Sequence, residues 1–177
     1  MRAQPNIALR PITTDDAPTI AAIRRDSRDH LAPWEPARGD DAHTDESALA
    51  SIKAALERTA AGTGRSYVIT DHARIVGGIL INSLVQGPYF RSCSIGYWVA
   101  RTDTGRGVAT EAVRLVKDIA FGELELQRVQ AETLVHNHAS QKVLERNGFT
   151  LIGLAPSYLK IAGTWQDHLL YQALPKD

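Results

Sequence analysis

The chain has 177 residues, 44% of them hydrophobic, and its 20 basic residues are balanced by 20 acidic ones. This length predicts one domain, residues 1–177, with room for a substantial core. Balanced charge gives no sign of the basic surface typical of nucleic-acid or anionic-membrane binding, and no apolar run approaches the roughly 18 residues of a membrane span. Cys93 is the single cysteine, which excludes a disulfide framework and a cysteine zinc site. We therefore expect a cytoplasmic protein without nucleic-acid or membrane partners.

The N-terminal part of the chain predicts a short strand followed by a helix. Residues 7–12 are expected to form the strand. Residues 13–16, Thr-Thr-Asp-Asp, then offer N-cap candidates and first-turn acids for a helix that carries Ile20 and Ile23.

A connector at residues 29–39 separates this helix from a second one. Thr44 is predicted to cap the second helix, and Gly62 is predicted to end it. Three apolar side chains are expected to face inward from it: Leu49, Ile52 and Leu56.

Three strands joined by short turns come next in the sequence. The strands are expected at residues 67–70, 75–81 and 92–99, with turns at residues 71–73 and near residues 86–88. Because connections this short join antiparallel neighbours, the three strands are predicted to pair in sequence order.

A glycine-rich turn, Gly105-Arg106-Gly107, joins the strand at residues 92–99 to an amphipathic helix at residues 108–120. Glycines leave successive backbone amides uncovered, and a helix N-terminus carries unpaired N–H groups and partial positive charge. The junction therefore predicts a phosphate-binding turn to which Arg106 adds a formal charge; a tight turn without a ligand is the alternative. Thr110 stands where a dinucleotide fingerprint needs a third glycine.

The second half of the chain predicts a crossover and a closing hairpin. The helix at residues 108–120 leads to a strand at residues 128–135, and a crossover of that length implies parallel pairing with residues 92–99. A helix at residues 138–147 and a hairpin of residues 149–161 and 165–174 follow. The predicted fold is α/β, a mixed sheet in the order β-α-α-β-β-β-α-β-α-β-β with helices on both faces.

Polar residues collect where the strand at residues 128–135 ends, in the sequence His136-Asn137-His138-Ala139-Ser140. Because open α/β sheets bind ligands at the carboxyl ends of their strands, these residues and the glycine turn predict one common site. Helix capping is the alternative role for Asn137 and Ser140. His136 and His138 have no carboxylate cluster nearby in the sequence, so we expect no metal.

The connector contains Trp34 and Glu35 between two prolines. An apolar ring in a loop indicates packing, and two interpretations remain open. Trp34 is either a plug at the edge of the core or, together with Glu35, one wall of a pocket for an acceptor substrate.

These motifs carry a resemblance to a known family. The sequences that carry it are Tyr97-Trp98-Val99, Gly105 to Ala112, Asn137-His138-Ala139-Ser140, Leu144 and Asn147-Gly148-Phe149. Together they resemble the GCN5-related N-acetyltransferases, and the predicted strand order is that of the family. Residues 31–36 and 158–168 look like the ribosomal-protein-alanine N-acetyltransferases, which acetylate protein N-terminal α-amines.

The resemblance implies acetyl-coenzyme A (acetyl-CoA) as the donor, bound at a splayed central pair of parallel strands. It implies that the pantetheine arm pairs with the backbone of Tyr97, Trp98 and Val99 and is hydrogen-bonded by Asn137. It implies that Ser140 assists the departing thiolate. The backbone amides implied to hold the pyrophosphate are those of Gly105, Arg106, Gly107, Val108, Ala109 and Thr110.

Three positions depart from patterns found in the family. Thr102 stands where an Arg or Gln is frequent, Leu144 where many members have a thiolate-protonating tyrosine, and Leu159 where some close relatives have a glutamate base. The catalytic acid and base therefore stay open. Candidate bases are Glu35, His136 and His138, and Tyr158 is an alternative proton donor.

We expect direct attack by an amine, because Cys93 lies within a strand pattern and has no histidine beside it in sequence. Deprotonating an α-amine of pKa ~7.8 at pH 7 costs about 1 kcal/mol, whereas a lysine of pKa ~10.4 costs about 4.6 kcal/mol. A site without an evident strong base therefore suits a protein or peptide N-terminus. The alternatives are a small-molecule amine as acceptor and a non-catalytic acyl-CoA-binding sensor. The apolar terminal hairpin also suggests a homodimer edge.

Overall fold

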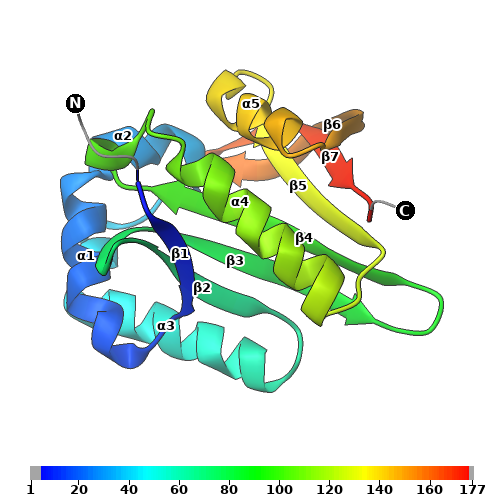
Figure 1. Cartoon of the computed structure of the whole chain (residues 1–177). Coiled ribbons are helices and arrows are strands. Elements are labelled where there is room, and N and C mark those ends of the chain that lie inside the picture. Colours follow the sequence, from blue (N-terminus) through cyan, green and yellow to red (C-terminus); the bar gives the residue numbers. More distant parts are fainter. Residues whose placement is uncertain (1–4, 176–177) are drawn as a thin grey trace.

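The computed structural model describes residues 5–175 as a seven-stranded mixed sheet with helices on both faces (Figure 1). Residues 1–4 and 176–177 of the predicted domain lie outside the described residues. The strands, in the spatial order β1-β2-β3-β4-β5-β7-β6, are β1 (Ile7–Pro11), β2 (Arg65–Asp71), β3 (Arg74–Gln86), β4 (Arg91–Val99), β5 (Arg128–Leu134), β7 (Thr164–Ala173) and β6 (Thr150–Ile161). The main helices are α1 (Ala17–Asp26), α2 (Arg28–Leu31), α3 (Asp45–Ala60), α4 (Val108–Asp118) and α5 (His138–Arg146).

This element order confirms the predicted fold class. Strands β2 to β4 pair antiparallel in sequence order, as their short connections require, and β1, which is joined to β2 through α1, α2 and α3, also pairs antiparallel with it. The pair β4 and β5 is parallel, and α4 is the crossover that joins them. The last strand, β7, lies between β5 and β6, antiparallel to both.

Strands β4 and β5 pair only over a short stretch and then separate. Hydrogen-bonded pairing covers Ser92–Ser94 of β4 and Arg128–Gln130 of β5, although β4 continues to Val99 and β5 to Leu134. Beyond that stretch β4 is still held by β3, and β5 is still held by β7. The predicted splayed parallel pair is therefore present at the centre of the sheet.

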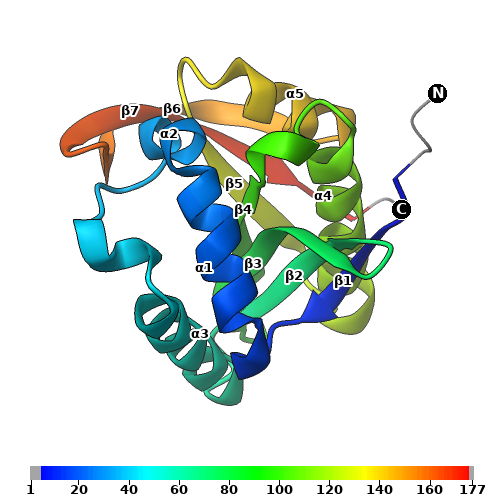
Figure 2. The same ribbon diagram turned by 90° about the vertical axis from the view of Figure 1, so that its left-hand side faces the viewer.

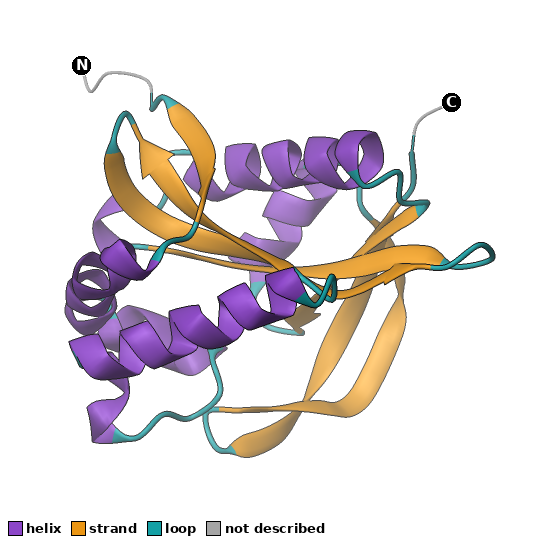
Figure 3. Cartoon of the chain, turned by 90° about the horizontal axis from the view of Figure 1, so that it is seen from below, coloured by secondary structure: helices purple, strands orange, loops and turns teal. Residues whose placement is uncertain are grey.

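Two hydrophobic cores cover the two faces of the sheet. On one face, α4 buries an apolar stripe at helical spacing, comprising Val108, Ala112, Val113 and Val116. On the other face, α1 and α3 pack against β2 and β3 through Ile20, Ile52, Val68 and Ile75. Figure 3 shows the helices on both sides, with the β6–β7 hairpin curving toward the side that carries α1 and α3.

One predicted core residue is wrong. Leu56 was expected to face inward from α3, but it is 36% exposed. The buried face of α3 consists instead of Ala48, Ile52 and Ala55, which recur at helical spacing. Small alanines let α3 lie close to its neighbours, and Leu56 then falls at the margin of the contact. Within the described residues, no helix is both long enough and apolar enough to cross a membrane.

Leu144 provides a test of the core beneath α5. Its side chain is fully buried, so Leu144→Ala is expected to lower the free energy of unfolding by about 2–5 kcal/mol, through lost burial and the cavity left behind. Urea unfolding measures the change. Leu174→Ala, at a side chain that is 54% exposed, is the control and should change stability by less than about 0.5 kcal/mol. Equal midpoints for the two variants would contradict the assigned core.

Candidate functional site

A cleft of about 520 Å³ opens where β4 and β5 separate. The backbone groups of residues 95–99 that face the gap have no partner on β5, so they remain available to a ligand. Except for Arg106, all the residues predicted to bind the donor line the cleft: Tyr97, Trp98, Val99, Gly105, Gly107, Val108, Ala109, Thr110 and Asn137. Segments far apart in the sequence thus meet at one end of the sheet.

The glycine turn presents backbone amides to this cleft. Gly105 has φ +73° and Gly107 has φ +80°, in the left-handed region that only glycine adopts without strain. No side chain caps the start of α4, and the first helical hydrogen bond is donated by the N–H of Glu111 to the carbonyl of Gly107. The N–H groups of Val108, Ala109 and Thr110 therefore have no partner within the helix. This geometry suits an anion at the helix N-terminus.

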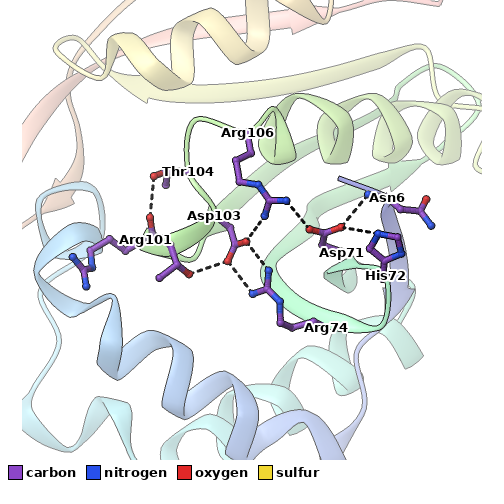
Figure 4. A network of polar contacts seen from close by, with 9 residues as sticks. Asn6, Asp71, His72, Arg74, Arg101, Asp103, Thr104 and Arg106 are labelled. Atoms are coloured by element: carbon purple, nitrogen blue, oxygen red, sulfur yellow. Dashed lines mark hydrogen bonds and ion pairs between the residues drawn. The ribbon is translucent and has the colours of Figure 1, made fainter. Parts of the chain in front are cut away.

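Arg106 lies outside the cleft and anchors the turn from behind (Figure 4). Its Nη1 donates to Asp103 Oδ1 at 2.8 Å, and its Nη2 donates to Asp71 Oδ2 at 3.1 Å. The sequence suggested that this guanidinium adds charge to a phosphate site. The structure places it instead between two carboxylates, so the positive character of the cleft comes from the backbone amides and from the side chains of Lys142 and Arg146, which also line it.

Asp103 is the centre of this charged network. Its side chain is 2% exposed and accepts from Arg74 at 2.7 and 3.0 Å as well as from Arg106. The hydrogen bonds from Arg74, together with those from Thr102 and Arg106, hold the pKa of Asp103 below its ordinary value. Asp71 also accepts from the backbone N–H of Asn6 at 2.9 Å. Two carboxylates and two guanidiniums thus tie the glycine turn to the β2–β3 turn.

The start of α5 forms the opposite wall of the cleft. Asn137 caps this helix, because its Oδ1 accepts the backbone N–H of Ser140 at 3.1 Å. The Ser140 hydroxyl lies 2.7 Å from the Tyr97 hydroxyl, which reaches it from β4. Burial raises the pKa of Tyr97 to about 12, so its hydroxyl stays protonated at neutral pH.

The connector brings Trp34 and Glu35 to the mouth of the cleft. Trp34 is 37% exposed, and its ring centroid lies 5.6 Å from that of His136. This exposure favours the interpretation in which Trp34 is one wall of a pocket, and not the one in which it plugs the edge of the core. Glu35 accepts from both terminal nitrogens of Arg24, at 2.9 and 3.0 Å, and lies 3.4 Å from Arg38. Its oxygens are therefore already occupied as acceptors.

The β6–β7 hairpin borders the connector. The N–H of Ala162, at the hairpin turn, donates to the carbonyl of Glu35 at 2.9 Å, and Figure 2 shows the hairpin passing beside α2. Tyr158 is 41% exposed, and its ring centroid lies 5.7 Å from that of His168. Neither Tyr158 nor His168 is among the residues that line the cleft.

Glu132, on β5, is a titratable residue that no motif in the sequence singled out. Burial raises the pKa of this carboxyl. Burial, together with the charge of Glu132, also raises the pKa of Tyr158. The signal that could have identified it is a glutamate near the carboxyl end of a central strand, between Ala131 and Thr133, because glutamate is rarely buried unless it is paired.

Cys93 is 2% exposed, and burial raises its pKa to about 12. A thiol with so little thiolate at neutral pH is a poor nucleophile, which favours direct attack over an acyl-cysteine route. Across residues 5–175, no three His, Cys, Asp or Glu side chains are grouped closely enough to hold a metal ion.

Comparison with known proteins identifies the family. Residues 6–150 match the family model described as an acetyltransferase (GNAT) domain. The chain is 32% identical to the probable N-acetyltransferase YjcK of Bacillus subtilis, over 97% of this chain and 95% of that protein. It is 29% identical to the [ribosomal protein uS5]-alanine N-acetyltransferase of Escherichia coli, over 93% of this chain and 85% of that protein.

Among solved structures, Mycobacterium smegmatis RimJ in complex with CoA-disulfide superposes with a TM-score of 0.91 and 34% identity, over 95% of this chain and 81% of that chain. The chain belongs to the GNAT family of acetyltransferases. Its relatives confirm the resemblance to the ribosomal-protein-alanine N-acetyltransferases.

The charged network behind the glycine turn gives a prediction with a defined pH dependence. Asp103→Asn leaves Arg74 and Arg106 without their shared carboxylate, and should lower stability at pH 7 by about 1–3 kcal/mol. Because the folded pKa of Asp103 lies below its ordinary value, the stabilisation it provides is fully present above about pH 5. That stabilisation disappears as the pH falls through the folded pKa. Urea unfolding of both proteins from pH 3 to pH 8 measures the difference, and a difference that grows on acidification would contradict the assignment.

Proposed function

We propose that the chain transfers an acetyl group from acetyl-CoA to the N-terminal α-amine of a protein. The observation that carries this proposal is the gap between β4 and β5, which runs into a cleft floored by the uncapped N-terminus of α4. A carrier with a pyrophosphate at one end and amide groups along its arm fits both features.

The donor is held through backbone groups in this proposal. Unpaired amides of residues 105–110 bind the pyrophosphate, where positive φ at Gly105 and Gly107 keeps side chains away from it. The free edge of β4 at residues 97–99 pairs with the pantetheine amides as an added strand would. Asn137, which lines the cleft, completes the contact with the arm.

The chemistry is a direct displacement. A neutral amine nitrogen attacks the thioester carbonyl carbon, the C–N bond forms, and the C–S bond breaks with its electron pair remaining on sulfur. A backbone N–H near Val99 holds the developing oxyanion, a contribution of about 3 kcal/mol in comparable sites. Ser140 is the group assigned to the departing thiolate, since its hydroxyl belongs to the cleft wall.

The proton released by the amine needs an acceptor. Glu35 was a candidate base, but its contacts with Arg24 and Arg38 suit it better to holding the wall beside Trp34. His136 beside Trp34, His138 and the half-buried Glu132 are the remaining candidates. Tyr158 stays an alternative proton donor. Deprotonation of an α-amine at pH 7 costs only about 1 kcal/mol. Such an acceptor therefore does not require a strong base.

The acceptor, the location and the assembly are further parts of the proposal. Relatives named for ribosomal-protein-alanine acetylation support a protein N-terminus as the acceptor and the cytoplasm as the location. Strand β6 lies at the edge of the sheet and exposes Leu151, Ile152 and Leu154. An apolar edge strand supports a second copy of the chain as an additional partner.

Acetyl transfer from acetyl-CoA to a panel of acceptors tests the proposal. The panel contains peptides with free and blocked N-termini, free amino acids and polyamines. We expect turnover on peptides with a free N-terminal residue and none on the same peptides when that amine is blocked. Turnover restricted to small amines would make the chain a small-molecule acetyltransferase. Tight donor binding without turnover on any acceptor would make it an acyl-CoA sensor.

Two substitutions separate binding of the donor from the chemical step. Gly107→Trp covers the amides of the turn and is expected to abolish donor binding, measured by calorimetry with coenzyme A. Ser140→Ala is expected to lower turnover while leaving that affinity nearly unchanged.

The matched control for the glycine variant is Gly62→Trp. Gly62 also has positive φ, at +70°, and open space around it, but it lies at the end of α3. This variant carries the same backbone strain without covering the cleft, so it should bind the donor normally. Normal binding by Gly107→Trp would mean that the pyrophosphate site lies elsewhere.

A further inference from the structure

The hydroxyl groups of Tyr97 and Ser140 form a part-buried contact between the sheet and α5. Their oxygens are 2.7 Å apart, and both residues line the cleft. Tyr97 comes from the half of β4 that has no partner on β5, and its ring packs against the core beneath α4. Ser140 lies in the first turn of α5, where its backbone N–H is already committed to Asn137. The two side chains are therefore held in place by different elements of the fold.

By geometry either hydroxyl could donate this hydrogen bond, and the acidities of the two groups favour one direction. Each hydroxyl has a single proton, and a phenol is the more acidic of the two groups and the better donor. Because burial keeps Tyr97 protonated, with its pKa raised to about 12, the phenol proton is available at neutral pH. Donation from Tyr97 to Ser140 leaves the serine proton free for a third partner.

We propose that Tyr97 is a positioning residue: it donates a hydrogen bond to Ser140 Oγ and thereby aims the serine proton at the sulfur that leaves during acetyl transfer. This inference rests on the proposed function. Without the phenol, the serine hydroxyl can rotate about its Cα–Cβ and Cβ–Oγ bonds, and its proton has no fixed direction.

The proton balance of the reaction limits what this pair of residues can do. A thiol has a pKa of about 8.5, well below that of the buried phenol, so moving the Tyr97 proton to sulfur would be unfavourable. The serine proton therefore stays on Ser140 and stabilises the thiolate as a hydrogen bond. The C–S bond breaks with its electron pair on sulfur, and the proton that completes the thiol is the one released by the attacking nitrogen.

The inference is tested by measuring the kinetics of acetyl transfer for the full chain and three variants. The acceptor is the one on which the wild-type chain shows turnover. Tyr97→Phe removes one oxygen atom and is expected to lower kcat by about 10- to 100-fold, at or below the low end of what general acids contribute. Its affinity for coenzyme A should stay within about 2-fold of wild type. Ser140→Ala should lower kcat by at least the same factor as Tyr97→Phe. The double variant, Tyr97→Phe with Ser140→Ala, should be no slower than Ser140→Ala alone, because the two residues act as one unit.

The control is Tyr89→Phe, the same change at a side chain that is 99% exposed in the β3–β4 turn. It should leave kcat unchanged. A second donor distinguishes positioning from a merely structural role. With the selenium analogue of acetyl-CoA, whose selenolate leaves more readily than a thiolate, the deficit of Tyr97→Phe should shrink toward none.

Any one of four results would overturn the role of Tyr97. These are a wild-type kcat for Tyr97→Phe, a loss of coenzyme A affinity that accounts for the defect of that variant, additive losses of kcat in the double variant, and an equal deficit with both donors. In each of these cases wild-type turnover would leave the proposed function intact. A wild-type chain without turnover on any acceptor would remove the proposed function itself, and the role of Tyr97 with it.

Discussion

The separation of β4 from β5 beyond Ser94 and Gln130 is the constraint on which the site depends. Backbone N–H and C=O groups require partners, and within a sheet they normally find them on the next strand. Here β3 holds one strand and β7 holds the other, so the gap cannot close without breaking those ladders. A ligand with amide groups of its own is the natural occupant of such a gap, and the glycine turn lies at its open end.

The charge of the site has an unexpected origin. Arg106 sits in the glycine turn, where its side chain would be expected to meet a phosphate, yet it pairs with Asp71 and Asp103 behind the turn. The ion-pair network is neutral, and its task is to hold the turn in shape. Attraction for an anion then comes from the oriented amides of the turn, together with the side chains of Lys142 and Arg146 on α5, which line the cleft. Within the loop, the side chain of Arg106 holds the shape and the backbone amides face the cleft.

The sequence predicted what local patterns control. The spacing of Gly105 and Gly107 between a strand and a helix identified the turn with two positive-φ glycines, and the connection lengths predicted the directions of β2, β3, β4 and β5. It could not predict contacts that depend on distant segments. Asp71 is 35 positions from Arg106, and nothing in either local sequence indicates that they meet. The pairing of Glu35 with Arg24 and the exposure of Leu56 likewise depend on how α1, α3 and the connector pack.

A crystal structure of the chain with acetyl-CoA is the decisive measurement of how the donor binds. We expect the pyrophosphate to lie on the amides of residues 105–110 and the pantetheine arm to run between β4 and β5. The acetyl group should then lie within reach of Ser140. Density for the carrier on any other face of the sheet, with the gap between β4 and β5 filled only by solvent, would contradict this placement of the donor.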